Sequence, residues 1–195
     1  MQTAGHNSMV DSPQVTAPSR LVLTGFMGAG KSTVGRALAK RLGWKFLDLD
    51  EIIVEAEGRS IADLFADLGE AGFREQERIA LASALKENST VLALGGGAVE
   101  TAANRELLRT TPNTQVIFLE APLGVLLQRC EQQIAPGSAV RPVLADPALL
   151  ERYALRLPYY RDAHHTFTTA GREPAEIVES ILTTISSGSK SISHS

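Results

Sequence analysis

The stretch GFMGAGKST, residues 25–33, decides the fold of this chain. It follows the apolar run RLVLTG and precedes VGRALAKRLG, whose spacing predicts a helix. Its residues Gly25, Gly30, Lys31 and Ser32 match the phosphate-binding loop motif G-x-x-x-x-G-K-[ST]. Glycines let successive backbone N–H groups point at phosphate oxygens, and the helix start adds its positive dipole end. The stretch therefore predicts a nucleoside triphosphate site between a strand and a helix.

Within this loop, different residues suit different parts of the nucleotide. The expected ATP contacts are Gly28, Ala29, Gly30, Lys31, Ser32 and Thr33. Lys31 is expected to reach the β- and γ-phosphates, and the Ser32 hydroxyl to ligate Mg²⁺. A dinucleotide fingerprint fits less well because Thr33 stands where the third glycine would be. A GTPase switch is disfavoured because the sequence contains no Asn-Lys-x-Asp segment.

Composition narrows the class of protein further. The chain has 195 residues, with 19 Lys and Arg against 22 Asp and Glu, so its formal net charge is −3. This balance gives no reason to expect nucleic acid or a membrane surface as a partner. No apolar run approaches the ~20 residues that span a bilayer, and the single Cys130 excludes an internal disulfide. We expect a cytoplasmic protein.

Five strand-like apolar runs alternate with segments of helical spacing. They lie at 21–25, 44–50, 90–95, 114–120 and 165–169. Such alternation indicates a parallel sheet with helices on both faces. The sequence predicts an α/β fold, a three-layer α/β/α sandwich with a five-stranded parallel sheet, of the P-loop NTPase, nucleoside monophosphate kinase-like class. One domain is expected over residues 20–186, between flexible tails at 1–19 and 187–195.

Acids and glycines follow two further predicted strands. Asp48 and Asp50 end the second strand, and alternation would send both carboxylates to the same side, at the edge where ligands of α/β sheets bind. A solvated strand end with helix-capping acids is the alternative. Gly95, Gly96 and Gly97 directly follow the third strand, where missing side chains allow a close approach to the backbone.

Three arginines are candidates to bind an anionic ligand. Arg74 lies three residues before Glu77 on a predicted helix, so the carboxylate can orient the guanidinium. Arg141 lies in a Pro- and Gly-containing stretch, about 131–145, that is typical of a lid. Arg156 is late in a helical segment that Pro158 should stop or kink. Arginine binds a planar carboxylate bidentately, although isolated arginines are usually surface residues.

Taken together, these motifs closely resemble the shikimate kinase family. The matching segments are GFMGAGKSTVGRALA, FLDLDEIIVEAEGRSIADLF, GEAGFREQE, LALGGGAV, RPVL and the Arg156-x-Pro-x-Tyr segment, in the family's order. The resemblance implies transfer of the γ-phosphoryl group of ATP to the 3-hydroxyl of shikimate, a step toward chorismate and aromatic amino acids. It also implies one Mg²⁺ per subunit as cofactor and ATP as co-substrate. Separately, we expect a monomer.

The resemblance assigns roles to individual residues. Asp50 would bind the substrate hydroxyls, and Asp48 would lie near Mg²⁺, through water, beside Ser32. Lys31, Asp48, Asp50 and Arg141 form the expected catalytic set. The substrate set is Asp50, Arg74, Gly95, Gly96, Gly97 and Arg156, in which the two arginines hold the carboxylate. Arg141 would reach the nucleotide phosphates, and Arg129 and Arg172 would flank adenine. The helix IIVEAEGRSIADLF would belong to a substrate-binding region at about 48–88.

The sequence departs from the family at two points, and two other functions stay open. The segment between Arg129 and Arg141 is longer than usual, and R-P-L-L appears as R-P-V-L from Arg141 onward. These changes should affect the rate at which the lid closes and the affinity for nucleotide more than the choice of acceptor. One alternative is a gluconate-type small-molecule kinase, which shares the loop and general fold. The other is a non-catalytic ATP-binding regulator, for which two arginines aimed at a carboxylate would have no purpose.

Overall fold

The computed structural model describes residues 17–132 and 147–189. The strands are β1 (Arg20–Thr24), β2 (Lys45–Asp48), β3 (Thr90–Ala93), β4 (Thr114–Glu120) and β5 (His165–Thr168). The helices are α1 (Lys31–Leu42), α2 (Leu49–Glu57), α3 (Ile61–Ala84), the 3₁₀ turn η1 (Ala98–Glu100), α4 (Ala102–Thr110), α5 (Leu123–Gln132), α6 (Pro147–Arg161) and α7 (Pro174–Ser189). None of these described helices is long and apolar enough to cross a membrane.

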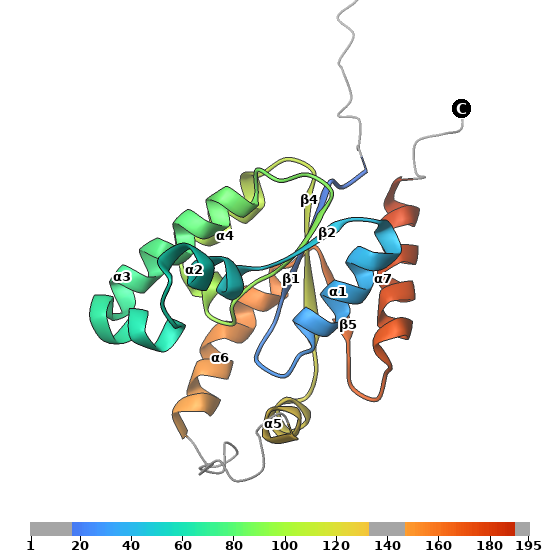
Figure 1. Ribbon diagram of the computed structural model, residues 1–195. Helices are drawn as coiled ribbons and strands as arrows, with labels where there is room; N and C mark the ends of the chain where they lie inside the picture. The colour runs from blue at the N-terminus through green and yellow to red at the C-terminus, as the bar shows by residue number, and fades with distance from the viewer. Residues whose placement is uncertain (1–16, 133–146, 190–195) are drawn as a thin grey trace, which may run out of the picture.

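The five strands form one parallel sheet in the order β2-β3-β1-β4-β5. Figure 1 shows this sheet nearly edge-on, with α1 and α7 on one side and α3, α4 and α6 on the other. The predicted three-layer α/β/α sandwich with five parallel strands is therefore confirmed. Because all strands point the same way, the residues that follow β1, β2 and β3 meet at one edge of the sheet.

The central strands are buried because helices cover both faces of the sheet. Leu21, Val22 and Leu23 of β1 are all fully buried, and every residue of β3 is buried. The outer strands β2 and β5 are only partly buried. Continuous apolar runs in the middle of the sheet are the pattern expected for a parallel sheet, and they place the core along β1, β3 and β4.

Several predicted boundaries differ from the structure. The segment IIVEAEGRSIADLF is two helices, because Gly58 ends α2 in a left-handed conformation with φ 64° and Ser60 caps α3. Pro158 lies inside α6, which continues to Arg161, so the expected helix stop is wrong. Pro158 removes one backbone N–H donor from α6, and the loss of this single hydrogen bond does not end the helix.

Sheet contacts and helix α7 extend into both regions that were expected to be tails. The backbone of Ser19 donates to Asn113 O at 2.9 Å and accepts from Thr90 N at 3.3 Å, so this residue is tied to the sheet. At the other end, α7 continues to Ser189, past the expected boundary at residue 187. The remaining parts of both expected tails, residues 1–16 and 190–195, lie outside the described residues.

Close packing of α1 on the sheet depends on Gly35. A Cβ atom at this position would lie 2.5 Å from Cε2 of Phe46 and 3.1 Å from Cδ1 of the buried Leu23. We expect Gly35→Ala to lower the free energy of unfolding by about 1–3 kcal/mol, because overpacking outweighs the better helix propensity of alanine. Urea unfolding measures this. Gly124→Ala on α5 is the control, since a Cβ there meets nothing within 4 Å. Equal stability of the two variants would contradict the close contact.

Candidate active site

The phosphate-binding loop joins β1 to α1 and exposes the start of the helix. Gly28 and Gly30 have φ values of 73° and 89°, which side-chain-bearing residues rarely adopt. A Cβ at Gly28 would also lie 2.3 Å from the carbonyl oxygen of Leu126. Gly30 is the N-cap of α1 and offers no side-chain cap, so no side chain competes for the first N–H groups of the helix. The loop is thus shaped to bind an anion.

The Lys31 side chain is folded back on its own loop. Its Nζ donates to the carbonyl oxygens of Gly25 at 2.8 Å and Phe26 at 3.1 Å. Burial lowers the pKa of the Lys31 ammonium to about 8, although the nearby Asp50 and Asp48 carboxylates act in the opposite direction. Anionic phosphates in the loop would favour the charged form and draw the ammonium outward.

Ser32 and Asp48 lie together at the mouth of the loop. Ser32 Oγ donates to Asp48 Oδ2 at 2.9 Å. The other oxygen of Asp48 accepts from the backbone N–H of Asp50 at 3.2 Å, so Asp48 caps α2. A hydroxyl and a carboxylate are oxygen donors that suit Mg²⁺, particularly one that keeps several of its waters. This pair could therefore hold Mg²⁺ beside the phosphates.

Asp50 is not on the strand, so the expected alternation of Asp48 and Asp50 along β2 is wrong. β2 ends at Asp48, and Asp50 lies in the first turn of α2. The capping interaction of Asp48 turns the chain into the helix one residue after the strand. The helix nevertheless directs Asp50 into the site, where its Oδ1 lies 2.6 Å from the position of a Cβ on Gly95. Burial raises the pKa of Asp50, and the charge of Asp48 adds to this effect.

The structure brings Arg74 of α3 and Arg156 of α6 to the glycines that follow β3. A Cβ on Gly97 would lie 2.7 Å from both Nη atoms of Arg74, and one on Gly96 would lie 3.6 Å from Nη1 of Arg156. A side chain at Gly95 or Gly97 would thus collide with the site residues. The three-glycine segment allows the backbone to form one wall of the site, as the sequence predicted.

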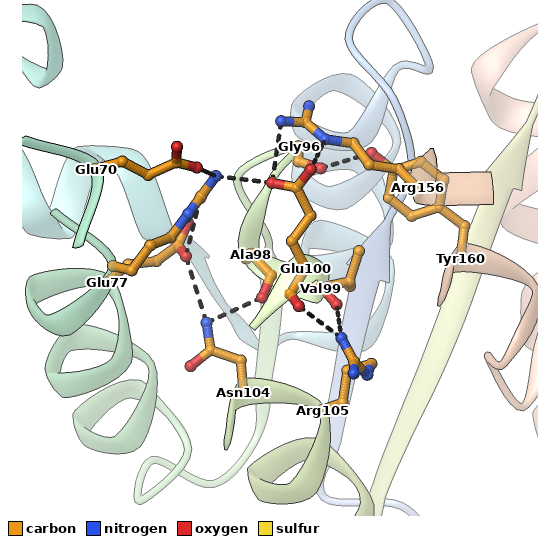
Figure 2. Close-up of polar contacts among 11 residues, drawn as sticks. Glu70, Glu77, Gly96, Ala98, Val99, Glu100, Asn104, Arg105, Arg156 and Tyr160 are labelled. Atoms are coloured by element: carbon orange, nitrogen blue, oxygen red, sulfur yellow. Dashed lines mark hydrogen bonds and ion pairs between the residues drawn. The ribbon is translucent and has the colours of Figure 1, made fainter. Parts of the chain in front are cut away.

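Glu77 orients Arg74, as expected from their spacing. Arg74 Nη1 lies 3.3 Å from Oε2 of Glu77, whose side chain is only 1% exposed. Asn104 Nδ2 donates to the same oxygen at 3.3 Å and to Ala98 O at 2.9 Å (Figure 2). Burial raises the pKa of Glu77, and Arg74 opposes this shift. Asn104 therefore fixes the carboxylate that in turn holds the arginine.

Sequence reasoning assigned no role to two residues of this site, Glu100 and Tyr160. The carboxylate of Glu100 lies between Arg74 and Arg156 and contacts both guanidinium groups. Tyr160 donates its hydroxyl to Gly96 O at 2.5 Å, and burial raises its pKa (Figure 2). Tyr160 follows Arg156 by one helical turn, which was a usable indication. Glu100 had no comparable indication, because its partners come from two distant helices.

A cavity of about 280 Å³ opens beside the phosphate-binding loop. Its lining includes Gly28, Ala29, Gly30, Thr33, Arg129 and Arg172. Arg129 spans the gap between two segments, since it donates to Gly28 O at 3.3 Å and to Thr169 O at 2.7 Å. Arg172 donates to Ser180 Oγ at 2.7 Å. The structure thus places both expected adenine-flanking arginines next to the phosphate loop, at the wall of one cavity.

One predicted site residue cannot be placed. Arg141 and most of the expected lid at 131–145 lie outside the described residues. All other expected site residues fall into two adjoining regions. The first contains the phosphate-binding loop with Arg129 and Arg172, and the second contains Asp50, the two clamp arginines and the glycines after β3. The two regions meet at Ser32, which donates to Asp48, and at Lys31, whose charge interacts with Asp50.

Comparison with known proteins agrees with this arrangement. A family model described as "Shikimate kinase" matches residues 27–186. The chain belongs to the shikimate kinase family. A shikimate kinase from Salinibacter ruber is 42% identical over 180 residues, 85% of this chain and 83% of that protein. Members of the family are ATP-dependent small-molecule kinases, and hence transferases.

Solved structures show the same likeness at the level of the fold. A shikimate kinase from Acinetobacter baumannii in complex with shikimate has a TM-score of 0.78 and 37% identity, and the match covers 90% of this chain and 96% of that chain. A gluconokinase from Sinorhizobium meliloti has a TM-score of 0.60 and 20% identity over 89% and 95% of the two chains. The second likeness shows a shared fold only.

The lowered pKa of Lys31 makes nucleotide binding proton-linked. With a pKa of about 8, Lys31 is about half protonated at pH 8, and bound phosphates should complete its protonation. We expect uptake of about half a proton per nucleotide at pH 8 and almost none from this group at pH 6.5. Calorimetry of Mg-ADP binding in buffers of different ionisation enthalpy measures the uptake. Equal proton uptake at the two pH values would contradict the lowered pKa.

Proposed function

We propose that this chain transfers the γ-phosphoryl group of ATP to the 3-hydroxyl of shikimate, giving shikimate 3-phosphate and ADP. This reaction is a step toward chorismate and the aromatic amino acids. Family membership supports it, together with the likeness to a structure that holds shikimate. We also propose that the enzyme is a cytoplasmic monomer. Its net charge of −3 favours a protein that binds neither nucleic acid nor membrane surfaces.

The observation that carries the proposal is the pair Arg74 and Arg156. These residues come from different helices, yet Arg74 Nη2 at 2.8 Å and Arg156 Nη2 at 3.3 Å contact the same oxygen of Glu100. One carboxylate can therefore be held by both guanidinium groups at once. Two converging arginines beside a phosphate-binding loop suit an acceptor that carries a carboxylate, such as shikimate.

Lys31 and Asp50, where the two regions meet, would perform the transfer. Lys31 would leave its loop carbonyls and neutralise the phosphoryl group, since this reaction depends on positioning and charge more than on covalent chemistry. Asp50 would bind the acceptor hydroxyls and take the proton of the reacting one. Its raised pKa makes it a better base than an ordinary carboxylate. Asp48 is less suited to this role, because its two oxygens already accept hydrogen bonds from the Ser32 hydroxyl and from the backbone N–H of Asp50.

Mg²⁺ fits the donors that the structure offers. We propose that Ser32 ligates it directly and that Asp48, which is 2.9 Å from the Ser32 hydroxyl, holds it through water. When bound, the ion neutralises charge on the phosphates. Within the described residues, no group of three or more His, Cys, Asp or Glu side chains could hold a metal ion. The proposed ligands therefore include a hydroxyl and waters.

Turnover of ATP with and without shikimate tests the function directly. We expect ADP release, measured by a coupled assay, to depend on shikimate and to be absent with gluconate. Turnover with gluconate would support the gluconate-type kinase. ATP binding without turnover on either acceptor would support the non-catalytic regulator. The gluconokinase likeness at 20% identity gives no support to the first of these alternatives.

Removal of the Lys31 side chain should abolish turnover. We expect Lys31→Ala to lower kcat by at least ~10²–10³-fold, because a preorganised positive charge is lost from the transferring group. The fold should survive, since the shape of the loop depends on its glycines. Steady-state kinetics and circular dichroism measure the two effects. A folded variant that keeps more than half the wild-type rate would refute the role assigned to this loop.

Arg74 and Arg156 should act as a pair on one substrate carboxylate. Arg74→Lys and Arg156→Lys keep the charge but lose the guanidinium fork, so each should raise the KM for shikimate about tenfold or more. The double variant should be less damaging than the product of the single effects, because both residues touch the same group. ATP affinity without shikimate is the control and should barely change. Independent effects, or an equal loss of ATP affinity, would exclude a shared carboxylate site.

A further inference from the structure

A carboxylate of the chain itself, that of Glu100, contacts both members of the arginine pair. The Oε2 atom of Glu100 lies 2.8 Å from Arg74 Nη2 and 3.3 Å from Arg156 Nη2, and its Oε1 lies 3.0 Å from Arg156 Nε. Figure 2 shows the Glu100 carboxylate directed at the Arg156 guanidinium, while the Gly96 carbonyl is joined to Tyr160. The N–H groups that would hold a substrate carboxylate are thus satisfied by a carboxylate of the chain itself.

Burial explains why the pair needs such a partner. The side chains of Arg74 and Arg156 are only 16% and 13% exposed. Two guanidinium groups held this close with little water would repel each other if no anion lay between them, and an unpaired buried charge is strongly destabilising. Glu77 neutralises Arg74 from the opposite side, but within the described part of the chain it makes no hydrogen bond or ion pair with Arg156. Among the residues that the structure describes, Glu100 is the acid that bridges the two arginines.

We propose that Glu100 is an internal carboxylate that occupies the arginine pair in the empty enzyme and is exchanged for the carboxylate of the acceptor. This inference rests on the proposed function, because it takes the pair to be the acceptor's carboxylate site. Glu100 thereby sets the affinity for the acceptor. An acceptor that lacks a carboxylate cannot replace it on the two guanidinium groups, so Glu100 also contributes to specificity.

The surroundings of Glu100 allow its side chain to leave while its backbone stays. The Glu100 carbonyl accepts from Arg105 Nη1 at 2.7 Å, and its N–H donates to Gly97 O at 3.0 Å. The side chain is 28% exposed, and in the described part of the chain its carboxylate has only the two arginines as hydrogen-bond partners. Rotation of Glu100 toward solvent would therefore break no other contact than the ones that the substrate replaces.

The exchange keeps the charge of the site balanced at every stage. One carboxylate replaces another, so neither guanidinium is left without an anion when the acceptor arrives or departs. The free energy of binding is then the difference between two carboxylate–arginine interactions rather than the full value of one. If Glu100 competes with the acceptor, removal of its charge should make acceptor binding tighter. If Glu100 only supported the arginines, the same change should make acceptor binding weaker.

Direct binding of shikimate without nucleotide tests the exchange. We expect Glu100→Gln to lower the Kd for shikimate at least threefold, measured by calorimetry. Glu70→Gln is the matched control, because Glu70 also pairs with Arg74 at 3.3 Å but is 72% exposed. Its Kd should stay within twofold of wild type, as expected for a solvent-screened pair. In an Arg156→Lys background, the gain from Glu100→Gln should shrink, because the two residues interact.

An unchanged or higher Kd in Glu100→Gln would overturn the proposal and leave Glu100 as a support for the arginines. If Glu100→Gln does not fold, Glu100→Asp serves instead. Its shorter side chain keeps the charge but cannot reach both guanidinium groups equally well, so its Kd should also fall, and an unchanged Kd would equally refute the exchange. Failure of the proposed function looks different. Wild-type enzyme would then show neither shikimate binding nor shikimate-dependent ADP release.

Discussion

The parallel direction of the strands is the constraint on which the site depends. Because β1, β2 and β3 point the same way, the phosphate-binding loop, the cap of α2 and the three-glycine segment all begin at one edge of the sheet. Each of these turns approaches its neighbours closely. Gly28 lies against the carbonyl of Leu126, and Gly97 lies against the Arg74 guanidinium. Missing side chains at this edge are therefore what brings segments far apart in the sequence within hydrogen-bonding distance.

The cations at this edge are paired with groups of the chain itself. Lys31 is held by two carbonyl oxygens near Asp50 and Asp48, and burial still lowers its pKa to about 8. The Arg74 guanidinium is held by Glu77, a buried acid that Asn104 fixes. Such pairing offsets the cost of holding charged groups in a largely buried site. Ligands then bind by replacing internal partners, which makes the affinity of the site adjustable by single acids.

The sequence predicted those parts of the site that are built from local motifs. The phosphate-binding loop and the glycines after β3 each lie in one short segment, so spacing alone located them. Asp50 was placed on the wrong element, because the competition between strand and helix at Asp48 is decided by a capping hydrogen bond. Glu100 was missed for a different reason. Its partners lie 26 and 56 residues away, and only the packing of α3 and α6 around η1 brings them together.

The three acids around Arg74 show why burial, more than distance, separates their roles. Glu70, Glu77 and Glu100 all lie within 3.3 Å of its guanidinium, but their side chains are 72%, 1% and 28% exposed. Water screens the first, so it contributes little. The second cannot reach solvent, so it acts as a fixed orienting group. The third is protected enough to pair strongly and accessible enough to leave, and of the three it is the one that also reaches Arg156. An acid at an intermediate depth is the one suited to exchange with an anionic substrate.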